Sequence, residues 1–355
     1  MRRKLRAGFA TGTATFLTAI LFLTANFSTA AAESRYGANY FPNVVLTTQD
    51  GKKVHFYDDV LKGKSVVIDM IYTTCGYSCP LETARLVQVQ KVLGDRVGKD
   101  IFFYSITIDP AHDTPKVLKA YMEKYHIGPG WTFLTGKKSD IELVGKKLGL
   151  WNNDPDPNNP DGHTPSVLIG NEPGGQWMRN AATDNPKFLA NMIGNWLSGW
   201  ANAKPMEANV DYSKAPQINL HTQSDKGRYI FASQCAACHT IGHGDKIGPD
   251  LLGVTNVRDH AWLERFITTP DKVLAAKDPL AVALFKKYKE VRMPNLNLAD
   301  VDLQNLLKFL ADQSAAPANT AAPAGTTKDA PSVDKSATGD SNTAAAKPDS
   351  GQPIR

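Results

Sequence analysis

The feature of this sequence that most constrains its structure is the pentapeptide Cys235-Ala-Ala-Cys-His239. The pattern C-x-x-C-H is the attachment signature of a c-type haem. It predicts thioether bonds from Cys235 and Cys238 to the haem vinyl groups, with His239 as the proximal ligand of the iron. The alternatives are a disulfide or a zinc site, and zinc would need two further ligands at suitable spacing. We therefore expect one covalently attached haem c.

The chain has four cysteines, and the other two form the segment Cys75-Gly-Tyr-Ser-Cys79. The apolar run at 65–72 predicts a buried strand directly before it, and Pro80 suits the first turn of a helix after it. The pair is therefore expected on a strand-to-helix turn, where thioredoxin-like folds hold their redox cysteines. A helix N-terminus favours the thiolate form of such cysteines. Three intervening residues leave room for two thiolates around one metal ion.

Two thiolates combined with one imidazole suit a copper ion. The candidate imidazole is that of His163, which precedes the apolar residues 166–169. The alternative is a plain disulfide between Cys75 and Cys79, with His163 as a surface residue. Five other histidines are not expected to be ligands: His55, His112 and His126, which lie in polar surroundings, and His243 and His260, which are expected to be surface residues.

The first 32 residues have the composition of a secretory leader, with a basic start, an uncharged stretch and small residues at its end. The uncharged stretch is also long enough to span a bilayer, so residues 1–32 are predicted to be a signal peptide or an anchor. In either case we expect the folded part to be exported, in bacteria to the periplasm, free or anchored to the inner membrane. Of the formal net charge of +5, four positive charges lie in this leader, which leaves +1. That remainder gives no reason to expect nucleic acid as a partner.

Residues 35–200 alternate apolar runs with amphipathic stretches, which predicts an α/β domain with parallel strand pairing. The expected elements are strands at 65–72, 101–108 and 166–169, and helices over 81–93, 115–125 and 188–200.

Residues 226–313 show helical patterns at 227–236, 260–268 and 298–313 without a convincing strand, which predicts a small all-α domain. Residues 201–225 are polar and irregular and are predicted to be a linker. Residues 314–355 are rich in Ala, Pro, Thr and Ser, with almost no large apolar side chain. Such a segment cannot bury enough surface to order itself, so we expect a disordered tail.

The second domain resembles class I cytochromes c over roughly residues 222–313. The resemblance is carried by Gly248-Pro249-Asp250-Leu251, by Met293-Pro294 and by the closing helical pattern. It implies Met293 as the second axial ligand of the haem iron, where a thioether raises the reduction potential. It also implies that Pro249 buttresses His239. Another methionine, Met206, precedes the haem motif in the linker.

Residues 38–200 resemble the Sco/SenC family, thioredoxin-like proteins that help to assemble the copper centre of cytochrome c oxidase. The matching pieces are the segments 75–80 and 105–115, together with His163 before its strand. The resemblance implies Cys75, Cys79 and His163 as copper ligands, with Asp109 as a neighbouring acid that shapes the site. The chain departs from the family in having no acid between the cysteines and in placing Gly162 before the histidine. These departures bear on copper affinity and not on the fold.

Three functions follow from these patterns. The first is an exported copper-binding assembly factor that serves the copper-bearing subunit of cytochrome c oxidase or other exported redox proteins, with the haem exchanging electrons. The second is a thiol–disulfide oxidoreductase in which the Cys75/Cys79 redox pair passes electrons to the haem. That reaction needs a further acceptor, because dithiol oxidation releases two electrons and a haem takes one. The third is a simple electron carrier whose thioredoxin-like half is a docking module.

Overall fold

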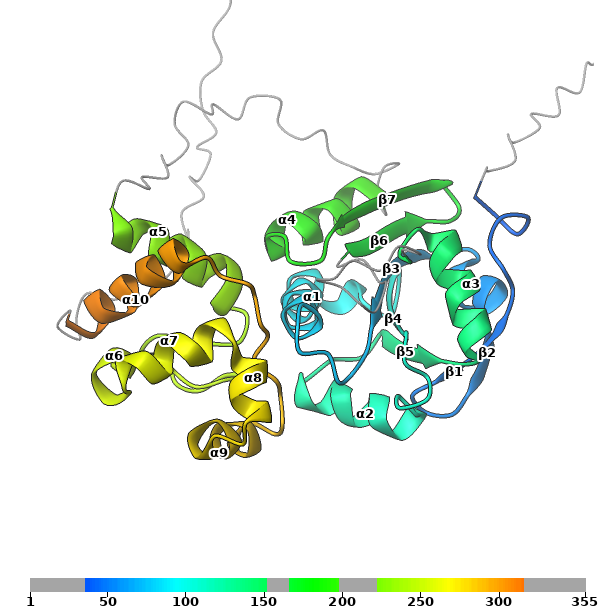
Figure 1. The fold of residues 1–355 in the computed structure, drawn as a ribbon. Coiled ribbons are helices and arrows are strands. Elements are labelled where there is room, and N and C mark those ends of the chain that lie inside the picture. The colour runs from blue at the N-terminus through cyan, green and yellow to red at the C-terminus, as the bar shows by residue number, and fades with distance from the viewer. Residues whose placement is uncertain (1–35, 152–165, 198–221, 316–355) are drawn as a thin grey trace, which may run out of the picture. The chain divides into compact units, whose positions relative to one another are not determined.

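A computed structural model describes residues 36–151, 166–197 and 222–315. The first two ranges form a domain around a seven-stranded mixed sheet, and the third forms a helical domain (Figure 1). The predicted leader lies outside the described residues, as do His163 and nearly all of the predicted linker and tail.

The sheet has the strand order β2-β1-β5-β4-β3-β6-β7. Its strands are β1 (Val45–Thr48), β2 (Lys53–His55), β3 (Ser65–Ile71), β4 (Ile101–Thr107), β5 (Trp131–Thr135), β6 (Ser166–Asn171) and β7 (Gln176–Ala181). The three expected strands are β3, β4 and β6, while the short strands β1, β2, β5 and β7 were not anticipated.

Only the centre of the sheet is parallel. Strand β3 runs parallel to β4, and β4 runs parallel to β5, whereas β6 is antiparallel to β3. The expectation of parallel pairing is therefore wrong for β6. Apolar periodicity shows which residues of a strand are buried, but the free edge of β3 accepts a neighbour in either direction. Because β6 runs antiparallel to β3, its first residue, Ser166, lies at the end of the sheet where β3 ends.

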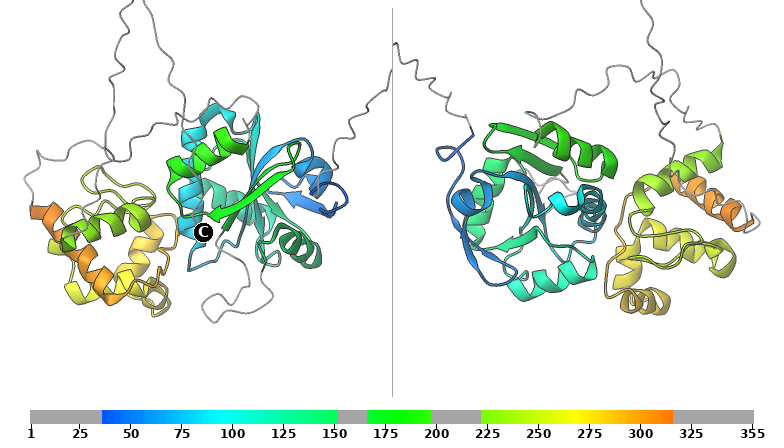
Figure 2. Two further views of the ribbon diagram at one scale, coloured as in Figure 1. Left: turned by 90° about the horizontal axis from the view of Figure 1, so that it is seen from above. Right: turned by 180° about the vertical axis from the view of Figure 1, so that it is seen from behind.

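Helices cover both faces of the sheet because the central strands are buried on both sides. Helices α1 (Cys79–Leu93), α2 (Pro115–Lys124) and α4 (Pro186–Asn191) share a core with Val67 and Ile71. Helix α3 (Lys138–Leu148) packs on the other face, against alternate residues such as Ile68 and Met70. Figure 2 shows α1 and α4 together on their face of the sheet.

The predicted helices of this domain are present with shifted ends. The helix expected over 81–93 is α1, which begins two residues earlier, at Cys79. The helix expected over 115–125 is α2. The closing helix, expected over 188–200, begins two residues earlier as α4 and passes at Met192 into a π-helical turn over Met192–Leu197, and residues 198–200 lie outside the described ranges.

The helical domain surrounds its own core, which includes Ile230, Trp262, Leu306 and Phe309. Its helices are α5 (Gln223–Ile230), α6 (Val254–Val257), α7 (His260–Thr268), α8 (Pro270–Ala275), α9 (Pro279–Lys287) and α10 (Asp300–Ala315). Its described residues form no strand, as expected, although helices α6, α8 and α9 were not anticipated. Within the part of the chain that the structure describes, no helix combines the length and the apolar character that a bilayer crossing needs.

Candidate copper and haem sites

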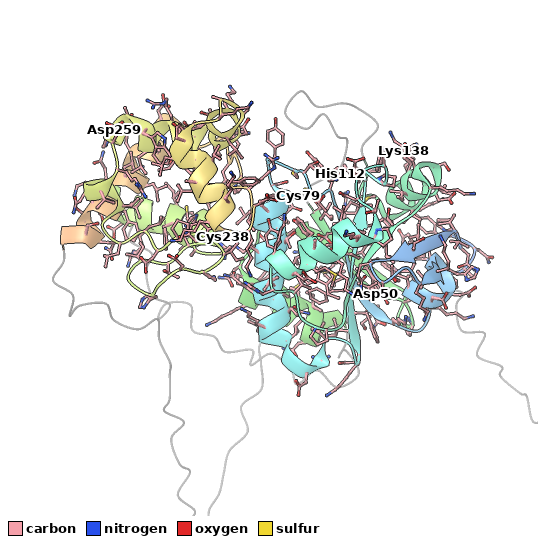
Figure 3. The ribbon with its side chains drawn as sticks, turned by 90° about the horizontal axis from the view of Figure 1, so that it is seen from below. Asp50, Cys79, His112, Lys138, Cys238 and Asp259 are labelled. Atoms are coloured by element: carbon pink, nitrogen blue, oxygen red, sulfur yellow. The ribbon has the colours of Figure 1, made fainter. Side chains whose placement is uncertain are left out.

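The first candidate site is the turn between β3 and α1, which carries Cys75 and Cys79. Both side chains are buried, with 2% and 0% exposed. Cys79 is the first residue of α1 (Figure 3), and Pro80 follows it in the first helical turn. The backbone N–H of Cys75 donates to the carbonyl of Tyr72 at 3.2 Å, which forms a tight turn directly after the strand. The predicted strand-to-helix placement of the pair is therefore confirmed.

The two thiols differ in their acidity. A hydrogen bond from Cys79, with a further one from the backbone N–H of Tyr77, lowers the pKa of Cys75 to about 7. The pKa of Cys79 is raised well above its ordinary value, because it donates to Cys75 and is buried. Cys75 is therefore the member of the pair that forms a thiolate first. A thiolate is the form that attacks disulfides and binds soft metal ions.

Two buried carboxyl groups lie behind the pair, and the sequence analysis missed both. Glu82 follows Cys79 by three residues on α1 and is fully buried. Among the described residues, neither of its oxygens makes a hydrogen bond by geometry, and the nearby Ser78 offsets the burial only in part. Burial, with the nearby charge of Asp69, raises the pKa of Glu82 to about 8. Burial likewise raises the pKa of Asp69, on β3, to about 7. Two features of the sequence could have indicated these acids. Asp69 interrupts an apolar strand, and Glu82 lies in the first turn of the helix that begins at Cys79.

A third buried acid, Asp113, contacts the segment that leads into the cysteine turn. It accepts hydrogen bonds from both the backbone N–H and the hydroxyl of Thr73. Asp109, which the resemblance implied as the acid that shapes the site, has a different place. Its carboxyl group accepts from the backbone N–H of His112 at 3.4 Å, within the loop before α2. The acid that touches the cysteine-bearing segment is therefore Asp113.

The predicted triad is not assembled within the described residues. His163 lies outside them, and the described ranges contain no cluster of three or more His, Cys, Asp or Glu side chains that could hold a metal ion. Among the histidines not expected to be ligands, His112 (Figure 3) has its Nδ1 atom 2.9 Å from Asp113. His55 pairs with Asp59 on the surface.

The second candidate site is the haem motif at the end of the first helix of the helical domain. Helix α5 passes into a π-helical turn over Phe231–Cys235, which leads directly to His239. Burial lowers the pKa of His239, so its imidazole is neutral. Its Nδ1 atom lies 2.9 Å from the carbonyl of Pro249 and donates to it, because a carbonyl can only accept. The Nε2 atom therefore keeps its lone pair for a metal ion.

The cavity beside this motif fits a haem. His239, Cys235, Cys238 and Met293 all line it. Most of the other lining side chains in this domain are apolar, among them Leu251, Leu263, Phe266, Leu284 and Leu306. Burial raises the pKa of Cys235 to about 12 and that of Cys238 to about 11, so both are protonated thiols in the chain alone. The cavity thus combines an available imidazole, two thiols, a thioether and apolar walls.

The loop after the motif is held by Asp250. Its carboxyl group accepts hydrogen bonds from the backbone N–H groups of Gly242, Gly244 and Leu252. Burial opposes ionisation, but these three hydrogen bonds lower the pKa of Asp250 to about 2. Asp250 is the residue after Pro249, so these bonds also fix the carbonyl that orients His239.

The fold and the two sites define a thioredoxin-like domain with a buried cysteine pair, joined to a helical domain that carries a c-type haem motif. Comparison with known proteins agrees with this. Residues 32–197 match the SCO1/SenC family model, and residues 224–314 match the cytochrome c family model. The chain therefore carries a SCO1/SenC domain followed by a cytochrome c domain.

Individual relatives match the first domain. The chain is 38% identical to the SCO1 protein homolog of Bacillus subtilis over 96 residues, 26% of this chain and 48% of that protein. It is 34% identical to a SCO2-like protein of Rickettsia felis over 108 residues, 29% of this chain and 51% of that protein. The chain thus spans about half the length of these curated relatives. A structure of Bradyrhizobium japonicum ScoI with copper bound is 25% identical, covering 42% of this chain and 94% of that chain, with a TM-score of 0.36.

Proposed function

We propose that this protein is an exported copper-binding and electron-transfer protein that assists assembly of the copper centre of cytochrome c oxidase. The observation that carries the proposal is the buried Cys75/Cys79 pair of a SCO1/SenC domain, in a chain that also holds a c-type haem motif. One copper ion is the cargo of the first domain. One covalent haem c, when bound, supplies one-electron transfer in the second.

The cysteine turn is suited to capture copper. Cys75 offers a thiolate near neutral pH, while Cys79 must lose its proton when the ion binds. Two soft thiolates favour Cu(I), and one imidazole completes a set that also accommodates Cu(II). We assign that imidazole to His163. In support, Ser166 follows it by three residues and begins β6 at the edge of the sheet where β3 leads into the cysteine turn.

The haem site is suited to electron transfer rather than to ligand chemistry. Pro249 fixes the tautomer of His239, so that Nε2 is directed to bind iron. Met293 lines the same cavity and is assigned as the second axial ligand. An iron with both axial positions filled exchanges electrons without binding small molecules. A haem held by these residues would supply one-electron chemistry, which suits it to set the oxidation state of the copper.

The destination and compartment follow from the same assignment. We propose that the copper is delivered to the copper-bearing subunit of the oxidase or to another exported redox protein. The leader directs the chain to the periplasm, as a cleaved signal or as an inner-membrane anchor. Fractionation of cells with an antibody to the folded part tests this. Recovery in the cytoplasm would contradict it, and release by osmotic shock would separate the cleaved form from the anchored one.

The test of copper binding is a Cu(I) competition titration of the haem-loaded, reduced protein against a chromogenic chelator. We expect one tightly held copper ion, with affinity lost in Cys75→Ser and strongly reduced in His163→Ala. His55→Ala is the matched control, because His55 pairs with Asp59 on the surface and is assigned no ligand role. Weak binding that is indifferent to His163 would remove the copper assignment.

The lowered pKa of Cys75 also favours a second candidate, a thiol–disulfide oxidoreductase. In that reaction Cys75 and Cys79 form a disulfide and release two electrons and two protons. One electron reduces ferric haem, and the other needs a second one-electron acceptor. Anaerobic mixing of the reduced dithiol with ferric haem in the same chain tests it. Failure of the haem to be reduced would leave copper binding as the function of the pair.

A further inference from the structure

The side chain of Asp113 is fully buried and collects four hydrogen-bonding groups. Its Oδ2 atom accepts from the backbone N–H of Thr73 at 3.0 Å and from the hydroxyl of Thr107 at 2.6 Å. Its Oδ1 atom accepts from the hydroxyl of Thr73 and lies 2.9 Å from Nδ1 of His112. A buried carboxyl group is stable when its oxygens are satisfied in this way. Both oxygens of Asp113 are therefore committed to specific partners.

These partners place Asp113 at the end of the two central parallel strands. Thr107 is the last residue of β4, and Thr73 follows the last residue of β3 by two positions. The parallel register pairs Ile71 with Thr107. The carboxyl group of Asp113 thus joins the two strand ends at the point where the cysteine turn leaves the sheet.

Thr73 is held by this acid rather than by the sheet. Its partly buried backbone N–H lies beyond the β3–β4 ladder, so the acceptor of this N–H comes from elsewhere. Asp113 supplies it and also binds the hydroxyl of the same residue. One residue before Thr73, the carbonyl of Tyr72 accepts the N–H of Cys75. Thr73 is therefore the second residue of the four-residue turn over 72–75. Its bonds to Asp113 hold this turn, which positions the sulfur of Cys75.

We propose that Asp113 is the positioning residue of the cysteine pair, fixing Cys75 relative to Cys79 through Thr73. The inference rests on the proposed function in that copper is the ligand it prepares the site for. The same positioning also governs closure of a Cys75–Cys79 disulfide. Asp113 contacts Thr73, Thr107 and His112 rather than either sulfur, so it acts through the turn. Groups that orient metal ligands in this way typically contribute 10- to 100-fold to metal affinity.

Two threonine variants separate positioning from general stability. Thr73→Val and Thr107→Val each remove one hydroxyl that donates to Asp113. Only Thr73 belongs to the cysteine turn, while Thr107 lies in the sheet. Asp113→Asn is the stronger change, because an amide cannot accept with both of its polar atoms. Asp109→Asn is its control, a neighbouring acid whose carboxyl group accepts within its own loop.

The experiment uses the full-length, haem-loaded protein and three readouts: Cu(I) affinity, the reduction potential of the Cys75–Cys79 pair, and the urea midpoint of unfolding. We expect Asp113→Asn to lower the Cu(I) affinity about 10-fold or more and to shift the potential. Thr73→Val should change both in the same direction by a smaller factor. Thr107→Val should lower the urea midpoint but leave affinity and potential as in the wild type, as should Asp109→Asn.

The outcomes are distinct. If Asp113→Asn folds and keeps wild-type affinity and potential, the inference is overturned. It is also overturned if Thr107→Val changes both as much as Thr73→Val, since the effect is then one of stability. If Asp113→Asn does not fold, the comparison of Thr73→Val with Thr107→Val decides between positioning and general stability. If the wild type binds Cu(I) weakly, the proposed function fails, and the reduction potential still tests the positioning of Cys75.

Discussion

The Nδ1 atom of His239 lies 2.9 Å from the carbonyl oxygen of Pro249, and the backbone reaches this position because Gly248 carries no side chain. A Cβ atom at Gly248 would lie 2.6 Å from Cε1 of the His239 ring, far inside van der Waals contact. The glycine therefore lets the chain pass against the imidazole, and the next carbonyl then fixes the ring. The geometry of the proximal ligand is set by the pair Gly248-Pro249.

This relationship predicts that Gly248→Ala displaces the ring of His239. Overpacking of this kind costs about 1–3 kcal/mol of folding stability. We expect the haem-loaded variant to show an altered absorption spectrum and weaker iron–imidazole bonding. The measurement is the spectrum of the ferric and ferrous protein, with a thermal unfolding curve. His243→Ala, an exposed change in the loop after the haem motif, is the control and should keep the wild-type spectrum. Equal spectra for Gly248→Ala and the wild type would contradict the argument.

The assignment of Met293 as an axial ligand predicts two changes in Met293→Ala. Loss of the thioether should lower the reduction potential of the haem, because thioether ligation stabilises the ferrous state. It should also open the sixth position to added imidazole or carbon monoxide, which the wild type binds poorly. A redox titration and a ligand titration measure these effects. Met206→Ala, in the linker outside the described residues, should change neither. Ligand binding in the Met206 variant alone would transfer the assignment to that residue.

The hydrogen bond that Cys75 accepts from Cys79 predicts unequal reactivity of the pair. With the haem attached, Cys235 and Cys238 are thioethers, so only Cys75 and Cys79 carry thiols. The alkylation rate of Cys75 should rise with pH through a midpoint near its pKa of about 7. Cys79→Ala removes the principal cause of that lowering, so the midpoint should move up toward 9.0. A midpoint that stays near 7 in the variant would show that another group lowers the pKa.

The placement of the two cysteine motifs could be predicted from the sequence better than the residues that hold them in position. A buried strand, a turn and a helix that begins near Pro80 are local features, so the placement of Cys75 and Cys79 followed from short-range patterns. The contact of His239 with Pro249 was likewise close in sequence. Asp113 was missed because its partner Thr73 lies 40 residues away, and only the pairing of β3 with β4 brings them together.

The direction of β6 was missed for a related reason. Strand periodicity depends on which residues are buried, whereas the direction of pairing depends on how the chain reaches the edge of the sheet. The antiparallel direction of β6 matters for the site, because it places Ser166, the first residue of β6, at the same end of the sheet as the cysteine turn. Glu82 was missed because a glutamate in a first helical turn is common at surfaces. Its burial depends on the packing of α1 against β3, which a local sequence pattern does not show.

Glu82 predicts how stability depends on pH in the copper-free protein. Its pKa is about 8 in the folded state against 4.5 for the ordinary group, so the folded state holds a proton that the unfolded state has lost. A raised folded pKa gives stability that is complete below pH 4.5 and is lost as the pH rises toward 8. The full difference corresponds to at most about 5 kcal/mol. Asp69 adds a loss of the same sign between pH 3.8 and about 7.

Glu82→Gln removes the titrating group while nearly keeping its shape. We expect the variant to match the wild type in stability near pH 5 and to exceed it by a few kcal/mol at pH 8. Urea unfolding at a series of pH values measures this. Glu123→Gln, an exposed change on α2, should leave the pH dependence unaltered. A Glu82→Gln protein that loses stability between pH 5 and 8 as steeply as the wild type would show that Glu82 is ionised in the folded state.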